Sequence, residues 1–427
     1  MLADNHARPV LSIVIPTRNR APYAMSAIES ILTISDPRLE LVIQDNGDEL
    51  DLGRWILARP HDPRLRYNHT ATPLSFIHNF DTAAGLATGE YLCFIGDDDG
   101  VNPEIVAAAE WASAEQLDAL VIKPSSHYLW RGSGIASTLF TEVTGGSLTI
   151  GDFTGAVTMT DVEMEVRGLL RHGGLYYLDR GVPKLYHGLV HRRCLEAVHR
   201  RTGAYFGGLS PDTYAALAIA CVAKRVAVID YPLTLPGSSP VSGAILEGAA
   251  KRHSKLLSDA PHLRHRGEYH WSALVPRVYT VESLWVDSSL AALRDMGRED
   301  LIAELDLPWL AALSIGANKG VTWPVVRDMI GGLRVLQRSV IVGIALLVWR
   351  LAIQKLRGGV RLMKRVRTRL RILSGGQTVH RIDGLENMVQ ATHALVVYLA
   401  GHGQNFAQLV SPSVLGDSLA WRSAGRE

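Results

Sequence analysis

A short apolar run that ends in three consecutive aspartates constrains this chain more than any other feature. In residues 89–103, GEYLCFIGDDDGVNP, apolar side chains from 91 to 95 precede Asp97, Asp98 and Asp99. Such a run between glycines predicts a buried strand, and carboxylates after a strand lie where ligands bind in α/β sheets. A divalent cation, bound together with substrate phosphates, would offset the repulsion among these charges. A solvated Asp-rich turn is the alternative interpretation.

The first residues of the chain predict a strand, a helix and a second strand. Residues 11–15 are apolar and β-branched, residues 21–32 carry apolar side chains at helical spacing, and residues 39–43 form another apolar run. This order predicts a βαβ unit. No G-x-G-x-x-G follows the first strand, which argues against a nicotinamide or flavin enzyme. Polar residues follow both strands: Thr17, Arg18, Asn19 and Arg20 after the first, and Gln44, Asp45 and Asn46 after the second.

Taken together, these segments resemble glycosyltransferase family 2, the inverting nucleotide-sugar-dependent enzymes with the GT-A fold. The resemblance covers about residues 1–240. It consists of a Pro-Thr-x-Asn-Arg loop after the first strand, an aspartate after the second strand, and an Ala-x-Gly-Glu-Tyr lead into the aspartates. The matching residues are Pro16, Thr17, Asn19, Arg20, Asp45, Ala87, Gly89, Glu90 and Tyr91.

The resemblance implies a Rossmann-like mixed sheet and a role for each matched loop. Asp98 and Asp99 would hold Mn²⁺ or Mg²⁺ on the diphosphate of a nucleoside-diphosphate sugar. Asp97 would contact the ribose or sugar of the donor. The residues expected to cradle the rest of the donor are Pro16, Thr17, Arg18, Arg20, Asp45 and Asn46.

Two departures from the family pattern bear on the donor site. Counting back from Pro103 puts Gly96 where the metal motif usually has its first aspartate. Asp98 is therefore the first metal ligand that we expect. Arg18 stands where many relatives have tyrosine, and its planar guanidinium can stack on a base.

The resemblance places the catalytic base on Asp212. Residues 212–223 are Ala-rich and predict a helix, and residues 226–229 predict the strand behind it. Many relatives have Glu-Asp at this point, whereas this chain has Pro211 before the aspartate. Asp212 could also serve as a helix cap and dipole partner, a role that does not exclude catalysis.

An inverting transfer needs few groups. A carboxylate takes the proton of the acceptor hydroxyl as that hydroxyl attacks, and a cation stabilises the departing diphosphate. The acceptor is expected within residues 121–208, where family position points to Tyr186, His187 and Gly188. The histidines and arginines of residues 187–201 could bind an anion, or form a solvated helix face.

After residue 240 the pattern becomes helical. Residues 238–243 predict a loop that could close over the donor, and residues 244–313 predict helices packed on the catalytic domain. Residues 329–382 contain twelve Lys or Arg and no Asp or Glu. Within them residues 339–349 are apolar, but Arg350 ends that run well short of the roughly 20 residues of a membrane span.

A basic amphipathic pattern continues over residues 352–373, where apolar side chains recur every three or four positions. Such helices lie on anionic membranes, so we predict membrane contact through residues 334–373. A packed helix with a solvated basic face is the alternative, and few aromatic residues argue against nucleic-acid binding. Gly358 and Gly359 could divide this segment into two helices.

Composition agrees with this layout. The chain has 427 residues and a formal net charge of +2, so its basic character is local. We predict a catalytic domain (1–240), a helical accessory region (241–330), and a membrane-associating segment with a tail (331–427). Three unpatterned cysteines predict no disulfide or zinc site and a reducing cytosol. Residues 1–9 lack the apolar core of a signal peptide.

The predicted protein is a metal-dependent inverting glycosyltransferase, peripheral on the inner face of the cell membrane. It would act on a polysaccharide or lipid-linked acceptor. The alternative is a non-catalytic carbohydrate- or membrane-binding protein on a decayed transferase fold, as Gly96 and Pro211 suggest.

Overall fold

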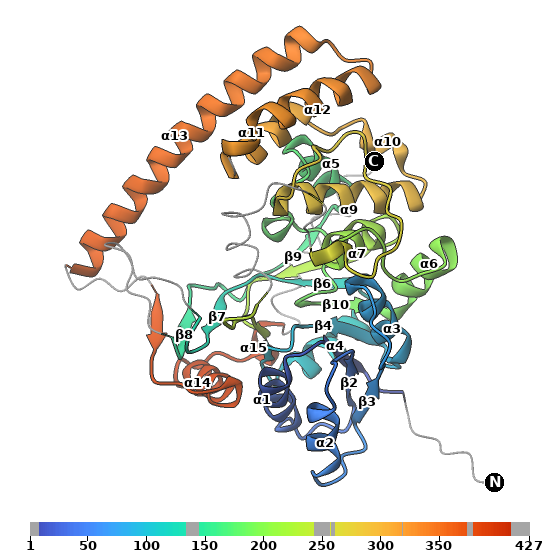
Figure 1. Cartoon of the computed structure of the whole chain (residues 1–427). Helices are drawn as coiled ribbons and strands as arrows, with labels where there is room; N and C mark the ends of the chain where they lie inside the picture. The colour runs from blue at the N-terminus through green and yellow to red at the C-terminus, as the bar shows by residue number, and fades with distance from the viewer. Residues whose placement is uncertain are drawn as a thin grey trace, which may run out of the picture.

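A mixed sheet of eight strands forms the centre of the molecule (Figure 1). The structure is a computed structural model that describes residues 8–133, 145–242, 257, 261–317, 319–373 and 379–410. The strand order is β3-β2-β1-β4-β10-β6-β11-β9, with β10 and β9 antiparallel to their neighbours. The strands are β1 (Leu11–Thr17), β2 (Leu39–Asp45), β3 (Leu65–His69), β4 (Tyr91–Phe94), β6 (Ala119–Ile122), β9 (Val157–Thr160), β10 (Gly188–His191) and β11 (Val226–Ile229).

Helices cover both faces of this sheet, as the alternation of side chains along β1 illustrates. Ile13 and Ile15 are buried against one set of helices, whereas Val14 is buried against the other. A sheet buried on both faces needs such continuous apolar strands. The first face carries α1 (Ala21–Leu32) and α4 (Ile105–Ala114), and the second carries α3 (Phe76–Leu86), α6 (Arg192–Thr202) and α7 (Pro211–Ala220). The short α2 (Asp51–Leu57) follows β2.

The predicted α/β fold class is confirmed. The helix predicted for residues 21–32 has these bounds, and the strand predicted for residues 226–229 is β11. The strand predicted for residues 11–15 extends to Thr17. Since β2 and β4 lie on opposite sides of β1, the sheet changes direction of winding there, which is where α/β proteins bind ligands.

A mainly helical region follows the sheet, as predicted. Its helices are α9 (Val281–Asp295), α10 (Glu299–Ile302), α11 (Leu307–Ala317), α12 (Thr322–Val335) and α13 (Val340–Leu373). The prediction of helix was wrong for residues 264–280, which are irregular. Side chains of later helices bind the backbone there: Asp287 accepts the N–H of Ser272 at 2.8 Å, and Asp328 accepts that of Arg277 at 2.9 Å.

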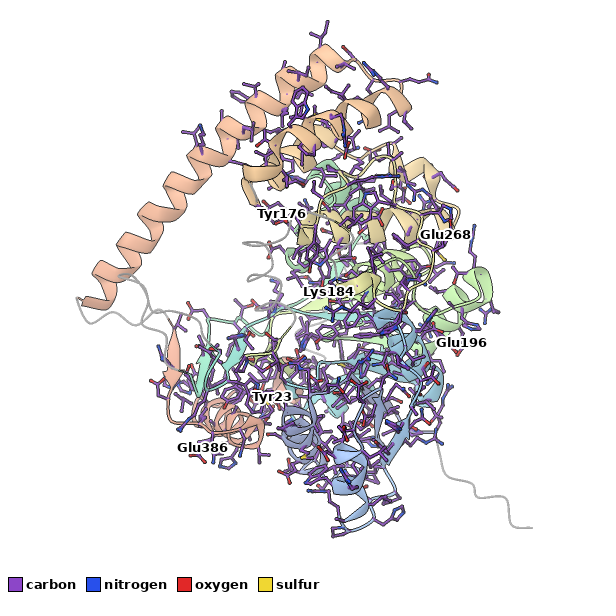
Figure 2. The ribbon with its side chains drawn as sticks, viewed as in Figure 1. Tyr23, Tyr176, Lys184, Glu196, Glu268 and Glu386 are labelled. Atoms are coloured by element: carbon purple, nitrogen blue, oxygen red, sulfur yellow. The ribbon has the colours of Figure 1, made fainter. Side chains whose placement is uncertain are left out.

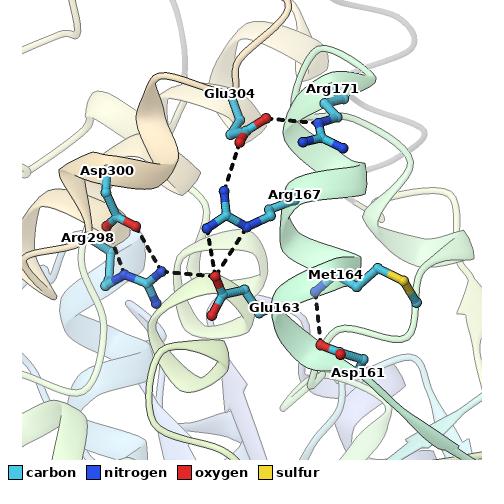
Figure 3. Close-up of polar contacts among 8 residues, drawn as sticks. All are labelled: Asp161, Glu163, Met164, Arg167, Arg171, Arg298, Asp300 and Glu304. Atoms are coloured by element: carbon cyan, nitrogen blue, oxygen red, sulfur yellow. Dashed lines mark hydrogen bonds and ion pairs between the residues drawn. The ribbon is translucent and has the colours of Figure 1, made fainter.

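An ion-pair network joins this helical region to α5 (Val162–Arg171), shown in Figure 3. Arg167 contacts Glu163 and Glu304 at 2.7 Å each. Arg171 binds the other oxygen of Glu304 at 2.8 Å, and Arg298 reaches Glu163 at 3.7 Å. Single exposed pairs contribute little, whereas a network fixes the geometry of two elements.

The C-terminal residues return to the N-terminal half of the chain. β14 (His380–Ile382) extends a second sheet, in the order β13-β7-β8-β14. α14 (Met388–Gly401) lies beside α1 (Figure 1), and Ser30 Oγ lies 2.8 Å from Thr392 Oγ1. The remaining elements are β5 (Gly100–Val101), β7 (Ser126–Leu129), β8 (Ser147–Ile150), β12 (Thr234–Leu235), β13 (Gly237–Ser238) and α15 (Phe406–Leu409), with the one-turn helices η1 (Tyr177–Asp179), η3 (Pro261–Leu263) and η4 (Lys319–Val321).

The long α13 links these two parts of the molecule (Figure 1). It is one continuous helix through Gly358 and Gly359, so the two glycines do not divide it. Their cost in helix propensity, about 1 kcal/mol each, is outweighed by the good helix formers around them. In the described part of the chain, no helix combines the length and apolar character needed to cross a membrane. The predicted domain boundaries stay predictions; residue 330 lies inside α12.

Candidate active site

The three aspartates follow β4 and are almost completely buried. Asp97, Asp98 and Asp99 are 2%, 4% and 3% exposed. Thr17, at the end of β1, donates its hydroxyl to Asp97 Oδ2 at 2.6 Å. The aspartates therefore lie at the winding change of the sheet, as the sequence predicts, but they are not a solvated turn.

Arg20 forms ion pairs with two of these carboxylates. Its guanidinium contacts Asp97 Oδ1 at 2.8 Å and Asp98 Oδ2 at 2.9 Å. It also donates to Ser239 Oγ at 2.7 Å, and the N–H of Ser239 donates to Asp98 Oδ2 at 2.9 Å. Arg20 thus acts within the aspartate cluster, a role that the sequence did not reveal.

Asp99 is held by several donors. Its Oδ1 accepts the N–H of Gly237 at 2.6 Å. Its Oδ2 accepts the N–H of Gly96 at 2.6 Å and the hydroxyl of Tyr186 at 3.0 Å, and His187 Nε2 lies 3.0 Å away. Although burial opposes ionisation, His187 and the two backbone N–H groups lower the pKa of Asp99. Asp99 is therefore ionised and fixed in position.

The pKa values of the other two aspartates, Asp97 and Asp98, are shifted in the opposite direction. Burial raises the pKa of Asp97 and of Asp98, and repulsion from the neighbouring carboxylates adds to it. The positive charge of Arg20 opposes both shifts. Three carboxylates that repel one another beside a single arginine are what is expected of a site that receives a cation.

The residues expected to bind the nucleoside lie at the ends of β1 and β2. Asp45 pairs with Thr17 in the register of these strands. Its carboxylate accepts the N–H of Gly47 at 2.7 Å and the hydroxyl of Tyr67 at 2.9 Å. Asn46 uses its side chain on three backbone groups, of Thr70, Thr72 and Leu74. Asn46 thereby fixes the loop that follows β3.

Arg18 is more exposed than these residues. Its guanidinium lies 3.3 Å from Asp48, which also accepts from the side chain of Asn19 at 2.7 Å. Asn19 adopts φ 57°, a left-handed conformation that asparagine tolerates. Arg18 therefore stands at the rim of the site, where its face is accessible to a base. Pro16 is buried within β1 opposite Gln44.

A cavity of about 620 Å³ joins the aspartates to Asp212. Asp98, Asp99 and Arg20 line one part of it, and His187 and Asp212 line it as well. Its volume lies in the range of about 300–1,000 Å³ that is usual for small-molecule sites. The structure thus brings together the predicted metal ligands and the predicted base, which are far apart in the sequence.

Asp212 is half-buried in the first turn of α7. Burial raises the pKa of Asp212 to about 6, His187 opposes this shift, and Asp99 adds to it. The helix predicted from Asp212 begins one residue earlier, at Pro211, because proline is well suited to the first turn. A carboxylate with a pKa near neutrality can accept a proton from a hydroxyl as a new bond forms.

The carboxylate oxygens of the aspartate cluster offer a partial fit to a divalent cation. Both hydrogen bonds that Asp98 receives from Arg20 and the Ser239 N–H reach Oδ2, which leaves Oδ1 as its oxygen for a cation. Both oxygens of Asp99 already accept hydrogen bonds. Mg²⁺ and Mn²⁺ commonly bind one or two carboxylates and complete their shell with phosphate and water. Within the described residues, no three His, Cys, Asp or Glu side chains form a ready cation cage.

Comparison with known protein families gives a match in the N-terminal part of the chain. The profile of glycosyl transferase family 2 matches residues 12–128. This part of the chain is similar to glycosyl transferase family 2. The predicted resemblance is therefore confirmed for the residues that carry β1, β2 and β4.

Curated relatives match within the same part. WcaA of Escherichia coli K12, a putative colanic acid biosynthesis glycosyl transferase, is 34% identical over 97 residues, which are 22% of this chain and 34% of WcaA. An uncharacterized glycosyltransferase of Rickettsia felis is 32% identical over 109 residues, which are 23% of this chain and 17% of the relative. The chain thus spans about a third or less of the length of these relatives.

Two solved structures are among those found in a comparison with this chain. S. aureus TarS 1-349 in complex with UDP-GlcNAc is 15% identical, covering 77% of this chain and 91% of TarS, with a TM-score of 0.43. The mannosyltransferase PcManGT of Pyrobaculum calidifontis, in complex with GDP-Man and Mn²⁺, is 16% identical, covering 81% and 88%, with a TM-score of 0.36.

The residues that match the family 2 model contain only part of the site. Thr17, Asp45 and the three aspartates lie within the matched residues, whereas His187 and Asp212 lie beyond them. The roles of all these residues stay predictions. Sequence reasoning missed the N–H groups of Gly237 and Ser239, because backbone donors leave no residue-type signal.

Proposed function

We propose that this protein is an inverting glycosyltransferase that moves a sugar from a nucleoside-diphosphate sugar to a hydroxyl group of a glycan or lipid-linked acceptor. One observation carries the proposal: within a chain whose N-terminal part matches the family 2 model, Asp98, Asp99 and Asp212 line the same cavity. The acidic cluster would receive the diphosphate with its cation. Asp212 would receive the acceptor.

Asp212 would act as the general base. Its carboxylate takes the proton of the acceptor hydroxyl while that oxygen attacks the anomeric carbon, from the face opposite the leaving diphosphate. The raised pKa of Asp212, about 6, favours proton uptake near neutral pH. Positioned proton transfer typically contributes 10²- to 10⁴-fold in rate. A covalent intermediate is not required.

Asp98, through its Oδ1, would hold Mn²⁺ or Mg²⁺, and the ion would offset charge on the leaving diphosphate. Asp99 would support this arrangement from its fixed position, because its oxygens already accept from Gly237 and Gly96. Asp97 and Thr17, which are joined by a 2.6 Å hydrogen bond, would line the part of the site that receives the nucleoside. Asp45, Asn46, Arg18, Arg20 and Pro16 would complete the donor site.

Thermal stability with UDP, GDP, CMP and dTDP, each with and without Mn²⁺, tests the donor site. A nucleotide at 100 times its dissociation constant should stabilise the folded protein by about 2.7 kcal/mol. We expect a metal-dependent shift with one nucleotide, lost in Asp98→Asn. Asp300→Asn is the matched control, because that carboxylate is exposed and lies outside the cavity. A shift that does not need Mn²⁺, or that survives Asp98→Asn, would contradict the metal assignment.

A second function is favoured by one observation. Arg20 already pairs with Asp97 and Asp98, as in a protein that has replaced its cation with an arginine. Such a protein would bind carbohydrate or membrane without catalysis. Asp212→Asn separates the two functions: a transferase should lose 10²-fold or more of its turnover, whereas a binding protein should keep its ligand affinity.

We infer in addition that the helical region contacts an anionic membrane surface. Trp323 on α12 and Ile341, Val348 and Trp349 on α13 are between 61% and 82% exposed. Exposed apolar side chains gathered on neighbouring helices mark interaction surfaces. The segment that carries α13 has no acidic residue from 329 to 382, so the partner that suits it is an anionic surface. With such a contact, the protein would lie peripherally on the inner face of the cell membrane.

Sedimentation with phosphatidylglycerol vesicles tests this inference. We expect binding at low salt, release at high salt, and weaker binding of the double variant Ile341→Ser/Trp349→Ser. The exposed Leu57→Ser, on α2 in the other half of the molecule, is the control. Equal sedimentation with neutral and anionic vesicles would refute the preference for an anionic surface, and no sedimentation at low salt would refute membrane contact.

A further inference from the structure

Lys184 is a buried lysine in the wall of the cavity. Its side chain is 6% exposed, and it lines the cavity that also contains Asp212. Figure 2 labels it near the middle of the molecule. The residues beside it in sequence, Val182 and Leu185, belong to the apolar core. A lysine is rarely buried in such surroundings without a partner for its charge.

The ammonium group of Lys184 has one hydrogen bond, to the carbonyl oxygen of Leu178 at 2.6 Å. Of the carboxylates that the structure describes, none lies within 4.0 Å of its Nζ as an ion pair. Burial lowers the pKa of Lys184 to about 8, against the opposing effect of Asp179, so the group is still mostly charged at pH 7. Burying a charge without a counterion is costly. The cavity wall therefore presents a positive charge that has no carboxylate counterion among the described residues.

The acids that act on Lys184 differ from those of the donor cluster. Arg20 is influenced by Asp97, Asp98 and Asp99, whereas the acids that act on Lys184 are Asp179 and Glu165. Asp212 interacts electrostatically with both Tyr177 and Asp99, and it lines the same cavity as Lys184. A molecule that reaches both Asp212 and Lys184 is on the acceptor side of the reaction.

An apolar, aromatic wall stands beside Lys184. Tyr177 and Trp285 meet edge to face, with ring centroids 5.0 Å apart, and both line the cavity with Leu284. Trp285 and Leu284 come from the first turns of α9, so the helical region supplies this wall. Aromatic faces suit the C–H face of a sugar ring, since they provide apolar area next to polar anchors.

We propose that Lys184 recognises an anionic group, a carboxylate or a phosphate, on the acceptor glycan, and that Tyr177 and Trp285 pack against the sugar ring that carries it. The inference rests on the proposed function, because Asp212 defines which side of the cavity receives the acceptor. It restricts the acceptor class to acidic or phosphorylated glycans. The anion would complete the ion pair that Lys184 lacks within the described residues.

Saturation-transfer NMR on the full-length protein tests the proposal with three probes of similar size. Methyl β-D-glucopyranoside is neutral, methyl β-D-glucuronide carries a carboxylate, and methyl β-D-glucopyranoside 6-phosphate carries a phosphate. We expect at least one anionic probe to bind tenfold or more tightly than the neutral one. Which anionic probe binds more tightly distinguishes a uronic acid from a phosphorylated sugar.

Variants assign the preference to Lys184. Lys184→Met should abolish the tenfold difference while leaving the neutral probe unaffected, and Lys184→Arg should keep part of it. Lys224→Met, on an exposed lysine outside the cavity, should change nothing. If Lys184→Met does not fold, the comparison of wild type with Lys184→Arg and Lys224→Met still reports the preference.

Three results would overturn the proposal. These are equal affinity for neutral and anionic probes, an anionic preference that survives Lys184→Met, and the absence of saturable binding by every probe. Nucleotide-dependent stabilisation of the same samples separates these results from a failure of the proposed function. If nucleotides stabilise the protein and the probes fail, only the acceptor inference is wrong.

Discussion

A Cβ atom on Gly96 would lie 2.6 Å from the hydroxyl oxygen of Tyr186. That hydroxyl donates to Asp99 at 3.0 Å, and the N–H of Gly96 donates to the same carboxylate oxygen at 2.6 Å. The position where the family pattern has an aspartate is thus a glycine because a tyrosine hydroxyl from the segment before β10 occupies the adjacent space. Asp99 gains a donor where a further carboxylate would have repelled it.

Gly96→Ala should therefore destabilise the protein by about 1–3 kcal/mol, the usual cost of overpacking a filled site. Tyr186→Phe removes the colliding atom, so the double variant should be less destabilised than the sum of the two single changes. Chemical denaturation measures all three. Gly85→Ala is the control, since nothing lies within 4 Å of its added Cβ. Strict additivity of the two changes would contradict the steric explanation.

Arg20→Gln should cost about 3–5 kcal/mol, because it leaves Asp97 and Asp98 buried without their counter-charge. Mn²⁺ should recover part of the loss, as it can replace the missing positive charge. Thermal melting with and without Mn²⁺ measures both effects. Arg18→Gln, whose pair with Asp48 is exposed, should cost no more than about 1 kcal/mol. Equal melting temperatures for wild type and Arg20→Gln would show that the pairing has no structural importance.

The pH dependence of transfer should reflect Asp212. A general base acts only when deprotonated, and the pKa of Asp212 is raised to about 6. The value of kcat/KM should therefore be constant above about pH 7 and fall tenfold per pH unit below about pH 6. In Asp212→Asn the residual rate should lose this dependence, whereas Asp300→Asn, an exposed carboxylate outside the cavity, should keep it. A profile that falls only below pH 4 would exclude Asp212 as the base.

Leu395 on α14 is fully buried, whereas Val397 on the same helix is 56% exposed. Leu395→Ala should destabilise the protein by about 2–5 kcal/mol, the cost of a cavity in a packed core. Val397→Ala should lie within about 0.5 kcal/mol of wild type. Denaturant titration compares them. Similar losses for both variants, or no loss for either, would mean that α14 is not part of the folded core.

The local elements of the fold could be predicted from the sequence because their signals are local. The apolar run before Pro16, the helical spacing of residues 21–32 and the run 226–229 each identify one element from adjacent residues. The prediction of helix in residues 264–280 failed for the opposite reason. There the conformation is fixed by distant side chains, such as Asp287 and Asp328.

The acidic residues of the site could be predicted from the sequence, whereas the groups that bind them could not. Asp98 and Asp212 belong to patterns that sequence reasoning can match by order and spacing. Arg20 was expected at the donor, but its bridge between Asp97 and Asp98 depends on the position of β4 next to β1. Lys184 gave one weak signal, a single charge among apolar residues. Its significance depends on burial, which neighbouring helices determine.

The contact between α14 and α1 also determines how long the nascent chain must wait before it can complete its fold. The N–H of Met388 donates to Ser26 Oγ at 3.0 Å across 362 residues of sequence, and Met388 also touches Gly100 just after the aspartates. A ribosome adding about 5–20 residues per second needs roughly 20–70 s to make the intervening chain. During that interval α14 has not yet been made, so the face of α1 that packs against α14 is exposed. The nascent protein therefore reaches its complete fold only after synthesis has passed α14.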